Sequence, residues 1–124
     1  MVRLSVFAVA CLALAGAASA RPIEAAWPEV ARAEQGECTL SITGDGRFYR
    51  IAASGLGAGE RARYVLDNGD MRPIDWQVRA DGNGEFARFY LPWRENHGDA
   101  QVTVSIDSAS CRLTVGFPFR AYTG

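Results

Sequence analysis

Three glycines stand at alternate positions in the stretch Ser54–Glu60, SGLGAGE, near the middle of the chain. Glycine-rich loops bind the phosphates of dinucleotides when the loop follows a strand, opens a helix and carries its third glycine at a longer spacing. Here the loop leads into residues 61–67, where apolar and polar side chains alternate as in a strand. The pattern therefore predicts a connection between two strands, in which glycine permits positive φ and close turns.

The single histidine, His97, is the other residue to weigh for catalysis or metal binding. It lies in the polar stretch WRENHGD, and no serine of the chain stands in a recognisable nucleophile motif. A blue-copper site would need a second histidine and a free thiolate. Acidic residues in the turns match only fragments of a calcium loop, because Asp-Gly and Asn-Gly are ordinary hairpin residues. We therefore expect no enzyme, no metal site and no cofactor.

The first 20 residues have the three parts of a secretory signal peptide. Arg3 supplies the positive start, an apolar run follows, and the small residues Ala18–Ala20 suit signal peptidase. A membrane anchor is the alternative, but the apolar run is shorter than the roughly 20 residues that a span needs. A lipidated Cys11 is a second alternative, although the usual leucine before it is missing. We expect residues 1–20 to be cleaved and the product to be secreted or periplasmic.

Cleavage would leave two cysteines, Cys38 and Cys111. An even number in a small secreted domain indicates a disulfide, and two cysteines allow one intramolecular pairing. One histidine is too few to complete a metal site with them. The whole chain has 13 basic and 14 acidic residues, so it lacks the basic excess of nucleic-acid-binding proteins. We predict a Cys38–Cys111 disulfide, no nucleic-acid partner and no membrane span after signal cleavage.

From Cys38 onward the chain alternates apolar and polar residues in short runs separated by Gly, Asn, Asp and Pro, a pattern typical of strands. Residues 21–37 lack the alternation, and we expect a loose leader or a short helix there; residues 120–124 form a tail. Such a density of strands predicts a two-sheet sandwich or a small barrel, with the disulfide between the first and last strands. The seven expected strands are residues 38–42, 47–53, 61–67, 76–80, 85–91, 100–106 and 111–117.

Several turn residues resemble those of the immunoglobulin-like modules of bacterial secreted and surface proteins. In those modules a GL-x-x-GE loop joins two strands and an AD-x-x-G hairpin follows. The resemblance covers roughly residues 38–119 and implies an all-β, seven-stranded immunoglobulin-like β-sandwich, used mostly for adhesion, linkage or binding. The matching positions are Gly55–Glu60, Asn68–Asp70, Ala80–Gly84 and Leu91–Pro92.

A hairpin over residues 76–91, turning at Asp81–Gly84, is the predicted binding surface. Either register of its turn points Trp76 and Phe89 into the core. The other face would expose arginines among aromatic rings, which suits anionic or planar groups of sugars and proteins. The alternatives are an ordinary solvated sheet, or a Phe86 covered by residues 21–37. The candidate binding residues are Arg79, Phe86, Arg88 and Tyr90 on this face, with Trp93 and Arg94 in the next loop.

Two functions remain after these exclusions. The first is a non-catalytic binding module that recognises an envelope protein or a glycan. The alternative is a small periplasmic inhibitor or hydrolase that uses the loop from Trp93 to His97.

Overall fold

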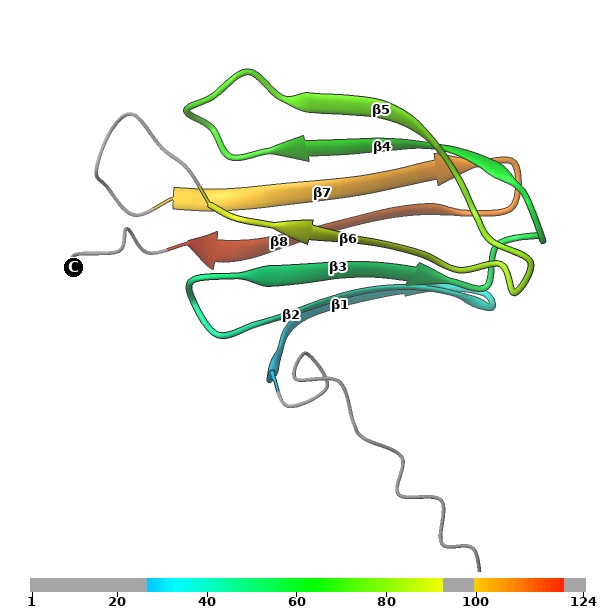
Figure 1. The fold of residues 1–124 in the computed structure, drawn as a ribbon, viewed down its shortest axis with the longest axis horizontal. Helices are drawn as coiled ribbons and strands as arrows, with labels where there is room; N and C mark the ends of the chain where they lie inside the picture. Colours follow the sequence, from blue (N-terminus) through cyan, green and yellow to red (C-terminus); the bar gives the residue numbers. More distant parts are fainter. Residues whose placement is uncertain (1–26, 93–99, 120–124) are drawn as a thin grey trace, which may run out of the picture.

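The computed structural model describes residues 27–92 and 100–119, which form two antiparallel four-stranded sheets (Figure 1). We call them sheet A and sheet B. In sheet A the order is β1 (Glu29–Gln35), β2 (Cys38–Gly44), β3 (Tyr49–Ser54) and β6 (Phe86–Tyr90). In sheet B the order is β5 (Ile74–Arg79), β4 (Arg61–Asp67), β7 (Ala100–Ser108) and β8 (Arg112–Phe119). The all-β class is confirmed, and no helix long and apolar enough to cross a membrane occurs in the described part of the chain.

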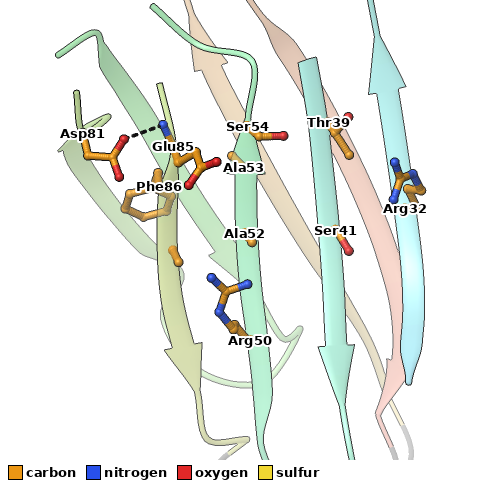
Figure 2. A pocket seen from close by; sticks show the side chains of 11 residues that line it. Arg32, Thr39, Ser41, Arg50, Ala52, Ala53, Ser54, Asp81, Glu85 and Phe86 are labelled. Atoms are coloured by element: carbon orange, nitrogen blue, oxygen red, sulfur yellow. Dashed lines mark hydrogen bonds between the residues drawn. The ribbon is translucent and has the colours of Figure 1, made fainter. Parts of the chain in front are cut away.

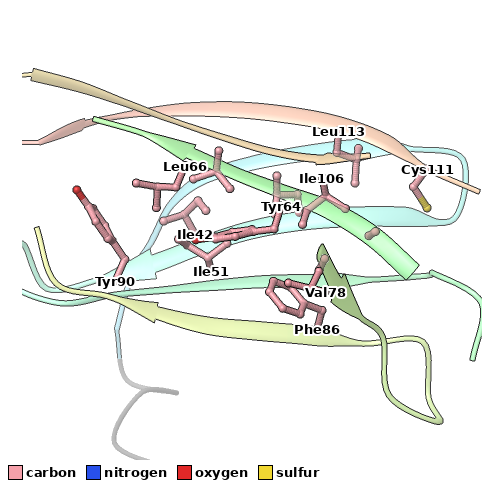
Figure 3. Packing of buried hydrophobic residues seen from close by; sticks show 14 of the residues in the cluster. Ile42, Ile51, Tyr64, Leu66, Val78, Phe86, Tyr90, Ile106, Cys111 and Leu113 are labelled. Carbon is pink, nitrogen blue, oxygen red and sulfur yellow. The ribbon is translucent and has the colours of Figure 1, made fainter. Parts of the chain in front are cut away.

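Alternate side chains of the two sheets meet in one hydrophobic core (Figure 3). Tyr64 and Phe117 are the largest side chains that are fully buried. Around them lie the β-branched and leucine side chains that the alternation predicts on the inner face. These are Leu40, Ile42, Ile51, Val102, Val104 and Ile106.

The chain has eight strands in its described part, not the expected seven, because β1 lies within residues 21–37. β1 pairs with β2 from Glu29 to Gln35, with a bulge between Glu29 and Ala31. Its inward side chains are only Ala31 and Ala33, which pack against the core. The structure thus has a strand where the sequence predicted a loose leader or a short helix. The prediction was wrong because the small inward residues and the bulge leave only a weak period-two pattern.

The expected hairpin over residues 76–91 is wrong. β5 pairs with β4 and β6 pairs with β3, so the segment between β5 and β6 crosses from sheet B to sheet A. The orientation of β6 is inverted as well: Phe86 and Tyr90 are 6% and 8% exposed, whereas Phe89 is 61% exposed. Both faces of this strand carry aromatic residues, so alternation alone does not decide which face turns inward.

The loop Ser54–Glu60 and the segment Ala80–Gly84 dock on each other. The Leu56 amide donates to the Gly84 carbonyl (3.1 Å), the Gly59 amide to the Asp81 carbonyl (3.0 Å), and the Ala80 amide to the Glu60 carbonyl (2.8 Å). The backbone amides of Leu56 and Gly59 are therefore engaged with the neighbouring loop. The prediction that Ser54–Glu60 is a strand connection is confirmed.

The Cys38–Cys111 disulfide joins the two sheets at one end of the sandwich, with its Cα atoms 6.1 Å apart. Cys38 begins β2 and Cys111 immediately precedes β8. The predicted pairing is confirmed, but the bond joins the start of the second strand, β2, to the residue before the last strand, β8, because β1 comes first.

We expect the double variant C38S/C111S to lose about 4 kcal/mol of unfolding free energy, because the bond closes a 73-residue separation. Urea denaturation of the oxidised protein and the variant measures the difference. A loss below about 1 kcal/mol would show that the disulfide contributes little to stability.

Gly84→Ala should destabilise the fold by about 2–4 kcal/mol. Gly84 has φ +73°, and an added Cβ would collide with the Leu56 carbonyl oxygen. Gly82→Ala, in the same loop but with open space around its Cβ position, is the matched control and should change stability by less than about 1 kcal/mol. Equal effects of the two substitutions in thermal unfolding would refute the docking of the two loops.

Candidate functional site

The structure does not assemble the predicted arginine–aromatic face. Arg79 lies on β5 in sheet B, whereas Arg88 lies on β6 in sheet A. Phe86 and Tyr90 belong to the core, so their expected exposure is wrong. Trp93 and Arg94, and His97 with them, lie outside the described residues.

One predicted residue, Arg88, lies at the open edge between β5 and β6. Its guanidinium carbon is 4.8 Å from the centre of the Phe86 ring. The Phe86 ring contacts that of Tyr64 (5.5 Å between centres), and Tyr64 contacts Trp76 (6.2 Å). Burial raises the pKa of the Tyr64 hydroxyl, which therefore stays neutral. Trp76, expected in the core, is 51% exposed because it stands on an edge strand.

A hollow of about 390 Å³ lies on the outer face of sheet A (Figure 2). We call it the sheet A hollow. Its floor consists of small side chains from β2, β3 and β6, so the longer side chains around it stand higher and form its rim. Arg32 lies on one side, and Asp81 and Glu85 lie on the other. The floor residues are Thr39, Ser41, Ala52, Ser54 and Ala87.

The two arginines of the sheet A hollow differ in their partners. Arg32 donates to Glu34 (2.7 Å) and to Glu29 (3.2 Å), and these hydrogen bonds, that to Glu34 first, raise the pKa of Arg32. Arg50 makes no hydrogen bond or ion pair with any residue that the structure describes. Its guanidinium is therefore available to a ligand that enters the sheet A hollow.

An aromatic pair lies next to Arg50. Arg50 stands opposite Phe89 in the β3–β6 register. The Phe89 ring meets the Trp27 ring edge-on, with centres 6.4 Å apart. A residue that precedes β1 thus covers part of β6, but it contacts Phe89 and not Phe86. The sequence pattern does not predict this cluster, because it places Phe89 in the core and Trp27 in a loose leader or a short helix.

Glu60 is the most extensively hydrogen-bonded carboxylate in the described residues. It accepts from the Ser110 amide (3.2 Å), the Ser110 hydroxyl (2.6 Å), the Gly57 amide (3.2 Å) and the Ser108 hydroxyl (3.2 Å). The Ser110 hydroxyl is the main cause of the lowered pKa of Glu60. These bonds tie the glycine loop to the β7–β8 turn beside Cys111.

The serine hydroxyls of β7 and of the β7–β8 turn make contacts within the fold. Ser108 and Ser110 are engaged with Glu60, and Ser105 lies 3.2 Å from the Thr114 hydroxyl. No group of three or more potential metal ligands occurs within residues 27–92 and 100–119. The sheet A hollow, in contrast, presents an available guanidinium, neighbouring rings and hydroxyls, of which that of Ser41 donates to Glu29 (2.9 Å).

No protein-family model matches this sequence, and comparisons with curated proteins and with solved structures find no match.

Glu60→Gln should lower the thermal unfolding midpoint at neutral pH, because an amide can accept fewer of the four hydrogen bonds. The pKa of Glu60 is depressed below the ordinary 4.5, so its contribution is present above that pH and is lost as pH falls through the lower folded-state pKa. The difference in midpoint between wild type and variant should therefore shrink as the pH falls from neutral to below 4.5. A difference that is constant over this range would contradict the assignment.

Proposed function

We propose that this protein is a non-catalytic, secreted or periplasmic binding module that recognises a glycan or an envelope protein. Its recognition surface is the sheet A hollow with the adjacent Trp27–Phe89 pair. The fold that presents this surface is an immunoglobulin-like sandwich with one additional strand at its beginning.

Strand order supports the immunoglobulin-like assignment. If the strands are lettered from Cys38, then β2, β3 and β6 correspond to A, B and E in one sheet. β5, β4, β7 and β8 correspond to C′, C, F and G in the other. β1 is then an extension that pairs with A.

The compartment is inferred from the chain's start and from its cysteines. Residues 1–20 have the composition of a signal peptide. Disulfides persist in oxidising compartments, and the Cys38–Cys111 bond is compatible with the periplasm or the extracellular space.

Arg50 is the observation that carries the proposal. A guanidinium without a carboxylate partner among the described residues, beside hydroxyls of neighbouring strands, provides donors for hydroxyl or carboxylate oxygens of a ligand. The aromatic pair beside it provides the apolar surface on which a sugar ring or a planar side chain packs. The hydroxyl-rich floor favours a glycan, and a protein partner is the other outcome of the test.

The test is capture of polysaccharide and protein from native envelope extract on immobilised mature protein. We expect Arg50→Glu to weaken capture at least about tenfold, since it replaces a cationic donor by an anionic acceptor. Ala52→Trp, which fills the hollow without changing charge, should do the same. Arg72→Glu, in the β4–β5 loop, is the matched charge control, because Arg72 is exposed and, like Arg50, makes no hydrogen bond or ion pair with a described residue; it should bind like wild type.

Each result discriminates between surfaces. Capture that survives both Arg50→Glu and Ala52→Trp but is lost in Arg88→Glu would move the site to the β5–β6 edge. Capture that survives all of these variants would exclude both surfaces.

A further inference from the structure

β5 is an edge strand whose outer side pairs with no strand that the structure describes (Figure 1). Exposed edges present unpaired backbone donors and acceptors, and they pair readily with another strand. Trp76, in the middle of β5, leaves half of its surface exposed. The edge thus offers both backbone hydrogen bonds and apolar area to a partner strand.

The charges on the outer face of sheet B are unbalanced along β5. Arg79 stands directly opposite Arg61 on β4, and neither side chain has an ion-pair partner among the described residues. Like charges in such a pair repel each other. At the other end of β5, Asp75 accepts two hydrogen bonds from Arg63, at 2.9 and 2.6 Å. β5 therefore carries a carboxylate and an uncompensated cation four positions apart on one face.

We propose that a second copy of this chain pairs with β5 in antiparallel fashion, with Gln77 opposite Gln77 at the two-fold axis. In a two-fold pair, only registers that match odd positions with odd positions keep the outer side chains on one face. Of these registers, this one places Asp75 of each copy opposite Arg79 of the other. On the inner face it places Trp76 opposite Val78, which covers the exposed part of the indole.

This register also relieves the Arg61–Arg79 repulsion. A carboxylate has about four acceptor positions, so Asp75 retains capacity beyond the two bonds from Arg63. On the outer face, Asp75 of one copy then lies between Arg63 of its own copy and Arg79 of the other. Sheet B continues into the sheet of the second copy.

The other edges lack this self-complementarity. The charges of β1 are already satisfied within the strand, because Arg32 pairs with Glu29 and Glu34. β6 carries Arg88 and no acidic residue, and β8 contains Pro118, which cannot donate to a ladder. Among the four edges in the described part of the chain, β5 alone carries opposite charges that only a second strand brings together.

The pairing is independent of the proposed function. The outer face of sheet A points away from sheet B, so both copies keep the sheet A hollow accessible. The dimer would present two such surfaces, which increases avidity for a repetitive ligand such as a polysaccharide.

The test is sedimentation equilibrium of the mature protein between about 1 µM and about 1 mM, where weak dimers are populated. Wild type should dimerise with concentration. Asp75→Arg and Arg79→Asp should each raise the dissociation constant at least about tenfold, because each places like charges opposite one another twice. Far-UV circular dichroism and the thermal midpoint confirm that both variants are folded.

Two complementary experiments decide the register. The D75R/R79D double variant should dimerise like wild type, because it exchanges the two partners. An equal mixture of the D75R and R79D single variants should form a heterodimer. In that mixed pair the introduced arginine faces the introduced aspartate, and the native Arg79 of one copy faces the native Asp75 of the other. A wild type that remains monomeric throughout, or single variants that dimerise as well as wild type, would overturn the proposal.

Discussion

The crossover between β5 and β6 is the constraint on which the rest of this structure depends. Three backbone hydrogen bonds hold it against the glycine loop, and Gly84 packs where no side chain fits beside the Leu56 carbonyl. This docking carries the chain from sheet B to sheet A instead of folding it back as a hairpin. The disulfide and the Glu60 hydrogen bonds fix the same end of the sandwich.

Both surfaces that we assign a role follow from this crossover. Because β6 pairs with β3, Ala87 faces outward and completes the sheet A hollow, with Asp81 and Glu85 from the crossover at its rim, and Phe89 faces outward beside Arg50. Because β6 leaves sheet B, the edge of β5 stays unpaired and Trp76 stays half exposed. The proposed ligand-binding surface and the proposed dimer interface thus lie on different sheets and need not compete.

Sequence alone predicts the all-β class, the disulfide and most strands, because alternation in β2, β3, β4 and β7 is strong and the inner residues are bulky. It fails at β1, where Ala31 and Ala33 give little contrast. It also fails at β6, where both faces carry aromatic rings. The turn residues Asp81–Gly84 are compatible with a hairpin and with a crossover, so they do not predict which strands β5 and β6 pair with. The backbone hydrogen bonds between this segment and the glycine loop decide that pairing.

The candidate site was largely beyond sequence analysis. The floor of the sheet A hollow consists of small residues that form no recognisable motif in the sequence. Arg50 differs from Arg32 in lacking a partner among the described residues, which only the structure shows. Arg79 and Arg88 are readily noticed among aromatic residues, but their sheets separate them.

The most direct test of the account is the pairing of β6 in solution, measured by nuclear Overhauser contacts between backbone protons. We predict contacts of β6 with β3, between Arg88 and Ile51 and between Phe86 and Ala53. Contacts between Ala87 and Val78 and between Phe89 and Trp76 would instead show a β5–β6 hairpin, and would contradict the crossover and both surfaces derived from it.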